Sequence, residues 1–217
     1  MPPTLRAILF DWDGTLIDSA ATSYRCFARL FASFDIPFDR QAFERTYSPT
    51  WYRIYAALGL PEREWQEADR RWLGFYQEQR SELIPGAREA LVRLRDSNWL
   101  QGLVTSGNRT RVTAELTALG LGHFFQTVVC SEDSRNKKPH PESLLLALEQ
   151  LAITPQQAVY VGDSPEDIEM ARAAGVRSIG IPGPFPNRNQ LAAAAPDLLA
   201  PNLAAAVTAL LTELRSV

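Results

Sequence analysis

The sequence predicts an α/β protein built around an open, parallel β-sheet. Short, almost continuously apolar runs recur along its 217 residues, and each ends in polar or glycine residues. Such runs are typical of strands that are covered on both faces. Between them lie segments whose apolar residues are three and four positions apart, which is the pattern of helices packed on a sheet. Strands that alternate with helices in this way indicate parallel pairing.

Five segments are predicted to form the strands of this sheet. They are residues 6–10, 100–105, 127–130, 158–161 and 177–181. The helical patterns that separate them are GAREALVRLRDSN, NRTRVTAELTALGLG, PESLLLALEQLAI and PEDIEMARAAG. The Ala- and Leu-rich end of the chain, AAAAPDLLAPNLAAAVTALLTEL, predicts a closing turn and one further helix, since its prolines break the helical pattern.

One long segment interrupts the alternation of strands and helices. Its apolar spacing is helical throughout, no strand is expected in it, and it holds most of the chain's aromatic residues. Because these aromatic residues predict a small core of their own, we interpret residues 16–82 as a helical domain inserted after the first strand. The α/β domain then comprises residues 1–15 and 83–217, and Pro85-Gly86 favours a turn where the chain re-enters it.

The composition argues against several classes of protein. A net charge of −3 gives no electrostatic reason to expect a nucleic acid as partner. The N-terminal sequence lacks the pattern of a signal peptide, and no apolar stretch reaches the roughly 18–20 residues of a membrane span. Cys26 and Cys130 lie far apart without a pairing motif, so we expect reduced thiols and a cytoplasmic protein, either monomeric or dimeric.

Polar residues of a distinctive kind follow four of the five predicted strands. In chain order they are Asp11 and Asp13; Thr105, Ser106, Gly107 and Asn108; Lys137 and Lys138, the only lysines; and Asp163 and Asp167. Because the carboxyl ends of parallel strands share one edge of a sheet, we expect these groups to meet there. Several carboxylates in one crevice need a cation among them, and oxygen ligands with room for water suit Mg²⁺.

These segments resemble the four motifs of a known enzyme family. The sequences DWDGTLIDS, VTSGN, KKPHPE and GDSPEDIEMARAAG are similar to those of the haloacid dehalogenase (HAD) superfamily, in the same order and with similar spacing. The resemblance covers essentially the whole chain and is strongest to phosphoglycolate phosphatase-like and sugar-phosphatase members. It implies a Rossmann-like core and a helical, C1-type cap, which in those members lies between the first and second motifs.

The resemblance also implies a reaction, the Mg²⁺-dependent hydrolysis of a small phosphorylated metabolite through an aspartyl-phosphate. It implies that Asp11 is the nucleophile that attacks phosphorus. It implies that Asp13 protonates the leaving alcohol and later deprotonates the attacking water. Thr105 and Lys138 are the other catalytic residues that the resemblance implies.

The same resemblance implies how the phosphate is bound. Thr105, the backbone N–H groups of Ser106 and Gly107, and Lys138 would hold the phosphoryl oxygens. Lys137 is expected to be a solvated neighbour of Lys138.

The resemblance implies a metal site as well. Mg²⁺ would bind the Asp11 carboxylate, the Asp13 backbone carbonyl and Asp163, with help from Asp167 that in the family often passes through water. Asp167 also lies where an acid stabilises the first turn of a helix, and Ser164 before Pro165 is a helix-start signal. The two roles of Asp167 are compatible.

Single residues separate related reactions of the superfamily. Asp13 argues against dehalogenation, in which no alcohol needs a proton, and the absence of lysine from residues 16–82 excludes a Schiff base formed in the cap. A sugar phosphomutase and a non-catalytic phosphate-binding module remain as alternatives to the phosphatase. Two departures from the family pattern stand out: Trp12, expected to affect packing only, and YSPTW in place of a Gly-containing cap loop, which leaves the preferred ester open.

Overall fold

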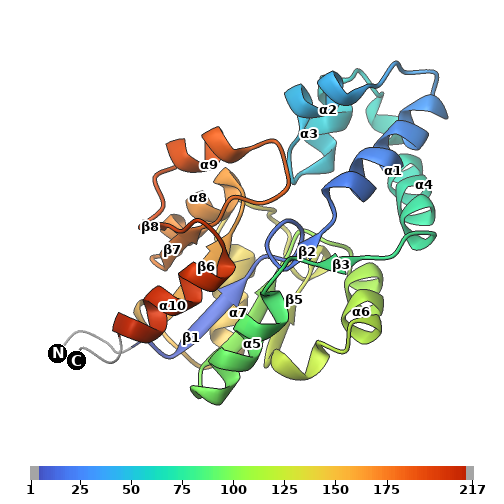
Figure 1. Cartoon of the computed structure of the whole chain (residues 1–217). Coiled ribbons are helices and arrows are strands. Elements are labelled where there is room, and N and C mark those ends of the chain that lie inside the picture. The colour runs from blue at the N-terminus through green and yellow to red at the C-terminus, as the bar shows by residue number, and fades with distance from the viewer. Residues whose placement is uncertain (1–4, 214–217) are drawn as a thin grey trace. The chain divides into compact units, whose positions relative to one another are not determined.

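The computed structural model describes residues 5–213 and contains a six-stranded sheet in the order β5-β4-β1-β6-β7-β8. Every neighbouring pair of strands in it is parallel, which confirms the predicted open α/β sheet (Figure 1). Its strands are β1 (Ala7–Phe10), β4 (Leu100–Val104), β5 (Thr127–Val129), β6 (Ala158–Gly162), β7 (Arg177–Gly180) and β8 (Leu198–Leu199). The strand order reverses at β1, and ligands of open α/β sheets bind at such a switch point.

The register places the ends of the three central strands side by side. Phe10, the last residue of β1, is paired with Leu103 of β4 on one side and with Val161 of β6 on the other. The residues that follow β1, β4 and β6 therefore emerge at the same edge of the sheet. This edge carries Asp11, Thr105 and Asp163.

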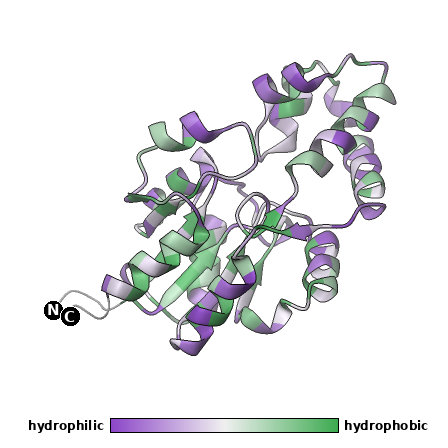
Figure 2. Ribbon diagram, viewed as in Figure 1, coloured by the Kyte–Doolittle hydropathy of each residue, from purple (hydrophilic) through white to green (hydrophobic). Residues whose placement is uncertain are grey.

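Helices cover both faces of the sheet. They are α5 (Ala87–Asp96), α6 (Arg109–Ala118), α7 (Glu142–Gln150), α8 (Pro165–Ala173), α9 (Arg188–Ala193) and α10 (Leu203–Glu213), with the short 3-10 turns η2 (Gly122–Phe124), η3 (Ser131–Asp133) and η4 (Pro155–Gln157). Successive residues of a strand point to opposite faces, so a strand that is covered on both sides must be apolar throughout. In β1, Ile8 and Phe10 belong to one apolar cluster, and Ala7 and Leu9 belong to another. Figure 2 shows this concentration of hydrophobic residues on the strands.

The helical insertion is a separate compact unit, Ser19–Glu82, while the α/β unit comprises the residues on either side of it. Its elements are α1 (Ala20–Ala32), α2 (Arg40–Thr46), α3 (Trp51–Ala57), η1 (Glu62–Glu64) and α4 (Trp65–Gln77). Phe27 is 1% exposed, and its ring contacts aromatic rings from α2, α3 and α4. The centroids of Trp51 and Trp72 are 4.1 Å apart. The aromatic residues thus form a core within this unit.

Three short strands were not expected from the sequence. The strands β2 (Ile17–Asp18) and β3 (Glu82–Leu83) pair with each other where the chain enters and leaves the insertion, in a stretch expected to contain no strand. β8 adds a sixth strand to the sheet where only a turn was expected. Two residues are too few to show an alternating pattern, so such strands are defined by the partner that they meet. Within residues 5–213, no helix is both long and apolar enough to span a membrane.

Candidate active site

Asp11 lies at the centre of the polar edge of the sheet. Its backbone N–H donates to the carbonyl oxygen of Val161 at 2.9 Å, which extends the pairing of β1 with β6 by one residue. Its side chain is therefore held at the point where the strands end, and Asp11 is only 7% exposed. Gly14 follows with φ +83°, a left-handed conformation that favours glycine, and turns the chain away from the sheet.

Lys138 reaches this edge from the loop before α7 and binds three groups. Its Nζ lies 2.7 Å from Asp11 Oδ1, 2.7 Å from Asp167 Oδ1 and 2.7 Å from the hydroxyl of Tyr160. An ammonium group has three N–H donors, so this set of acceptors satisfies it. Lys138 is 5% exposed, so its positive charge interacts with groups of the site and not with solvent. Lys137 instead donates to backbone carbonyls of the preceding loop, those of Ser131 and Ser134.

The pKa values of the site reflect its burial. Burial raises the pKa of Asp11 to about 7, although the charge of Lys138 opposes the rise. Burial, followed by repulsion from Asp11, raises the pKa of Asp163 well above its ordinary value. Burial disfavours the charge of Lys138, but the carboxylates of Asp11 and Asp167 outweigh it and raise the lysine pKa. The charge of Lys138 therefore does not offset the effect of burial on the pKa of Asp11.

The donor set fits a divalent cation. One carboxylate oxygen from each of Asp11, Asp163 and Asp167 lies within 4.8 Å of the others. Asp163 Oδ2 is buried and has no hydrogen-bond partner among the described residues. A Cβ at Gly14 would lie 2.2 Å from this oxygen, and one at Gly183 would lie 2.4 Å from it. A buried, charged oxygen without a partner is costly, so a hard cation that binds oxygen suits this position.

Asp167 differs from the other two carboxylates because hydrogen bonds already occupy both of its oxygens. Oδ1 accepts from Lys138, whereas Oδ2 accepts from the backbone N–H and the hydroxyl of Ser164 at 3.1 and 2.7 Å. Ser164 Oγ in turn accepts from the N–H of Asp167, which forms a capping box at the start of α8. Ser164 therefore caps α8 as predicted. A Cβ at Gly162 would lie 2.5 Å from the Asp167 carboxylate, so this approach requires glycine there.

The loop after β4 lies on the other side of Asp11. The N–H of Thr105 donates to the carbonyl oxygen of Val129, and its hydroxyl accepts from the N–H of Gly107 at 2.9 Å. The Asn108 side chain accepts from two N–H groups at the start of α6 and caps that helix. The structure thus places Thr105 and Ser106 at the expected edge, with the Gly107 N–H already engaged by Thr105.

Asp13 makes a contact that the sequence did not indicate. Its two carboxylate oxygens accept from Nη1 and Nη2 of Arg111, at 3.0 and 2.5 Å, and Arg111 belongs to α6. Arg111 Nη1 also lies 3.2 Å from Glu115 Oε2, which accepts from the indole N–H of Trp12 at 2.7 Å. Trp12 was expected to affect packing only, but it also fixes this carboxylate. The available signal was a charged pair four residues apart in a helix that must bury one face.

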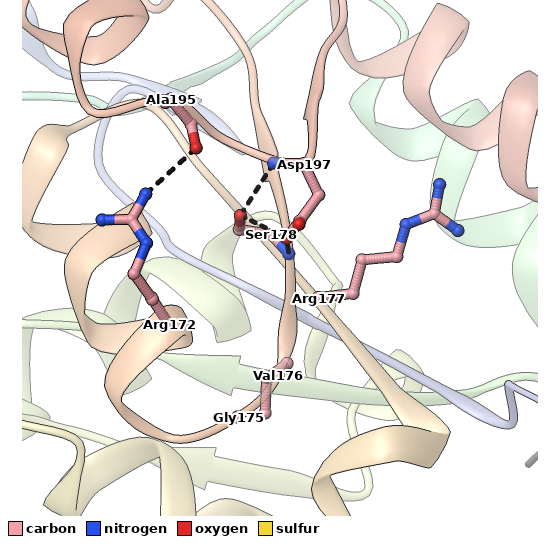
Figure 3. A pocket seen from close by; sticks show the side chains of 7 residues that line it. All are labelled: Arg172, Gly175, Val176, Arg177, Ser178, Ala195 and Asp197. Carbon is pink, nitrogen blue, oxygen red and sulfur yellow. Dashed lines mark hydrogen bonds between the residues drawn. The ribbon is translucent and has the colours of Figure 1, made fainter.

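A hollow lies elsewhere on the α/β unit (Figure 3). It has a volume of about 280 Å³ and is lined by Arg172, Gly175, Val176, Arg177, Ser178, Ala195 and Asp197. Its charged groups are already paired: Arg172 with backbone carbonyls, Asp197 with Ser178, and Arg177 with Glu213. These contacts hold β7 to its neighbours, and the hollow contains none of the residues described above.

Comparison with known proteins agrees with the geometry. Residues 8–181 match the model of the haloacid dehalogenase-like hydrolase family. A phosphoglycolate phosphatase of Escherichia coli K12 is 31% identical, over 82% of this chain and 81% of its own. The crystal structure of CbbY from Rhodobacter sphaeroides, in complex with phosphate, is 27% identical with a TM-score of 0.76, over 93% of this chain and 96% of that one.

A haloacid dehalogenase-like hydrolase from Streptococcus pneumoniae has the same fold, with a TM-score of 0.82 at 24% identity, over 94% of this chain and 97% of that one. The family match, the relatives and the arrangement of β1, β4 and β6 all lead to the same assignment. The chain belongs to the haloacid dehalogenase-like hydrolases and is phosphoglycolate phosphatase-like, with a helical cap inserted after the first strand.

Proposed function

We propose that this chain is a Mg²⁺-dependent phosphatase that hydrolyses a small phosphomonoester, with Asp11 as the nucleophile. The observation that carries the proposal is the cluster at the end of β1. In it, Lys138 holds one oxygen of Asp11 at 2.7 Å, and one oxygen of Asp163 lies within 4.8 Å of oxygens of Asp11 and Asp167. Asp163 Oδ2 is buried and has no hydrogen-bond partner among the described residues. A carboxylate held by one lysine beside a site for a divalent cation is suited to attack a phosphate, which itself carries negative charge.

The nucleophile is oriented by its hydrogen bonds. Because Lys138 binds Asp11 Oδ1, Oδ2 is the oxygen that attacks phosphorus, and the bond from phosphorus to the leaving oxygen breaks as the new bond forms. Asp13 gives its proton to the leaving alcohol. Water, from which Asp13 then takes a proton, cleaves the resulting aspartyl-phosphate. Such proton transfer typically accelerates a reaction ~10²–10⁴-fold.

The remaining residues bind the phosphoryl group and the cation. Thr105 and the backbone N–H of Ser106 hold phosphoryl oxygens, and Lys138 balances the charge of the transferred group. Gly107 allows the loop to approach closely. Asp11, the Asp13 carbonyl and Asp163 would bind Mg²⁺, and Asp167, whose oxygens are hydrogen-bonded, would act on it through water. The ion supplies the positive charge that offsets the repulsion between carboxylate and phosphate.

Phosphoglycolate is the first substrate to test. Relatives that match over most of this chain include phosphoglycolate phosphatases, at 29–31% identity. We expect residues of the cap to select the ester, and the YSPTW segment of the cap departs from the family pattern.

A panel of phosphorylated metabolites tests the proposal. Phosphate release is measured with Mg²⁺ and with EDTA, for the wild type, for Asp11→Asn and for Asp96→Asn. Asp96, at the end of α5, is exposed and pairs with its neighbour Arg95, so it is a matched control. We expect release by the wild type and D96N with Mg²⁺ only. Turnover by D11N, or turnover that persists in EDTA, would contradict the proposal.

A further inference from the structure

We propose that Arg111 positions Asp13 for proton transfer, and that Glu115 and Trp12 hold Arg111 in place. This inference rests on the proposed function, in which Asp13 is the acid and base. No motif of the sequence indicated Arg111 or Glu115. The inference follows from four side chains, all within the α/β unit, that form one continuous hydrogen-bonded chain.

The contact between Arg111 and Asp13 is a two-pronged one. Nη1 and Nη2 of the guanidinium lie 3.0 and 2.5 Å from the two oxygens of the carboxylate. Two parallel hydrogen bonds fix the plane of a carboxylate as well as its position, which a single lysine ammonium does not do. The arginine side chain is 6% exposed and that of Asp13 is 26% exposed. The buried arginine therefore holds a carboxylate that is partly exposed to solvent. Each oxygen of Asp13 keeps a second lone pair that can accept a proton.

Glu115 and Trp12 fix the arginine from behind. Glu115 lies one helical turn after Arg111 in α6, is 9% exposed at its side chain, and accepts from Arg111 Nη1 at 3.2 Å. The indole N–H of Trp12 donates to the same Glu115 oxygen at 2.7 Å. Because Trp12 and Asp13 are neighbours in sequence, both ends of the chain of contacts return to one loop. The loop after β1 is thereby tied to α6 at two adjacent residues.

The loop after β4 leaves room for this arrangement. A Cβ at Gly107 would lie 2.5 Å from Arg111 Nη2 and 2.8 Å from a methyl group of Val112. Contacts this short force a neighbour to move, so the glycine keeps the arginine beside the loop that carries Thr105. Lys138 pairs with Asp11 and Arg111 pairs with Asp13, so a different cation orients each of the two aspartates.

The way in which kcat/KM depends on the leaving group shows whether Arg111 positions Asp13 or only stabilises the fold. An alkyl phosphate has a poor leaving group and needs a proton from Asp13, whereas 4-nitrophenyl phosphate has a good one and needs little help. The constant kcat/KM reports the steps up to transfer of the phosphoryl group to Asp11, so it isolates the acid role. It is measured for both substrates, together with the thermal midpoint of each variant and its inhibition by inorganic phosphate.

The variants are Arg111→Met, Arg111→Lys, Glu115→Gln and Asp13→Asn, with Arg177→Met as control. Arg177 also forms a two-pronged pair, with Glu213, but lies in β7 outside the site. We expect R111M to lower kcat/KM for the alkyl ester about 10²-fold and to change that for 4-nitrophenyl phosphate no more than about threefold. R111K and E115Q should show the same selectivity with smaller losses. R177M should change neither constant.

The variant D13N shows whether the loss in R111M acts through Asp13. D13N should show the selectivity of R111M, and the double variant should lose little more than D13N alone, because the arginine acts through the aspartate. Equal losses on both esters, or weaker inhibition by phosphate, would overturn the proposal in favour of a structural or phosphate-binding role. If R111M fails to fold, E115Q and Trp12→Phe test the proposal instead, by the loss in kcat/KM for the alkyl ester relative to the loss for 4-nitrophenyl phosphate. If the wild type releases no phosphate from either ester, the proposed function itself fails.

Discussion

The metal-free protein should become less stable as the pH rises from 5 to 8. Asp11 carries the effect, because burial raises its pKa from 3.8 to about 7 in the folded chain. A carboxyl with a raised pKa in the folded state is held protonated there while the unfolded chain has already ionised. Its contribution to stability is complete below pH 4 and is lost as the pH passes through 7.

The magnitude follows from the size of the shift. A difference of about three pKa units corresponds to about 4 kcal/mol in the free energy of unfolding between pH 4 and pH 8, at about 1.4 kcal/mol for each unit. About two of these units, or about 3 kcal/mol, are lost between pH 5 and pH 8. Asp163, whose pKa is also raised by burial, acts in the same direction. Ion pairs lower the pKa of carboxylates such as those of Glu67 and Glu213, so these groups titrate below this window. Burial also raises the pKa of Asp69 in the cap, so the comparison with a variant at Asp11 is what assigns the loss to the site.

Urea denaturation in EDTA at several pH values measures this dependence, with Asp11→Asn as the matched variant. The wild type should lose stability toward pH 8, and D11N should lose less because asparagine does not titrate. Mg²⁺ should restore most of the loss at pH 8, since it binds the ionised carboxylates of the folded state only. A metal-free wild type that is equally stable or more stable at pH 8 would refute the reasoning.

Three further outcomes are expected. Lys138→Met should destabilise the metal-free protein at pH 8 by about 3–5 kcal/mol in urea denaturation, because it leaves buried carboxylates without their cation, and no change would contradict this. Gly162→Ala should cost about 1–3 kcal/mol and weaken Mg²⁺ binding in calorimetry, since its Cβ would lie 2.5 Å from Asp167; wild-type affinity would argue against that strain. Phe27→Ala should cost about 3–5 kcal/mol by removing the centre of the cap core, which fluorescence-monitored unfolding would test.

The composition of the strands determined the main features of the fold. A run such as Ala7–Phe10 must be covered on both faces, and the helical spacing between such runs supplies the covering helices. Parallel strands end at one edge, so polar residues after several strands must gather there. The order of strands and helices along the chain is therefore enough to predict that Asp11, Thr105 and Asp163 lie at one edge of the sheet and that Lys138 reaches it from a loop.

Pairings between distant segments were beyond this reasoning. The two-residue strands β2, β3 and β8 are too short to have a pattern, and they exist because another strand lies beside them. Only one of the two contacts of Asp167 could be predicted from the sequence. Its position after Ser164 indicated a helix cap, but its hydrogen bond with Lys138 depends on the path of a loop 29 residues earlier in the chain.

The sequence by itself thus determined which residues stand at the ends of the strands, because strand and helix periodicity is local. Only the tertiary structure decided which side chains contact and orient these residues. Arg111 and Glu115 read as an ordinary charged pair of a helix, and nothing local indicates that their partners are Asp13 and Trp12, about a hundred residues earlier. Arg111 and Glu115 can be buried together because the folded sheet brings α6 against the loop after β1. In that loop the arginine pairs with Asp13, and the glutamate accepts from Trp12.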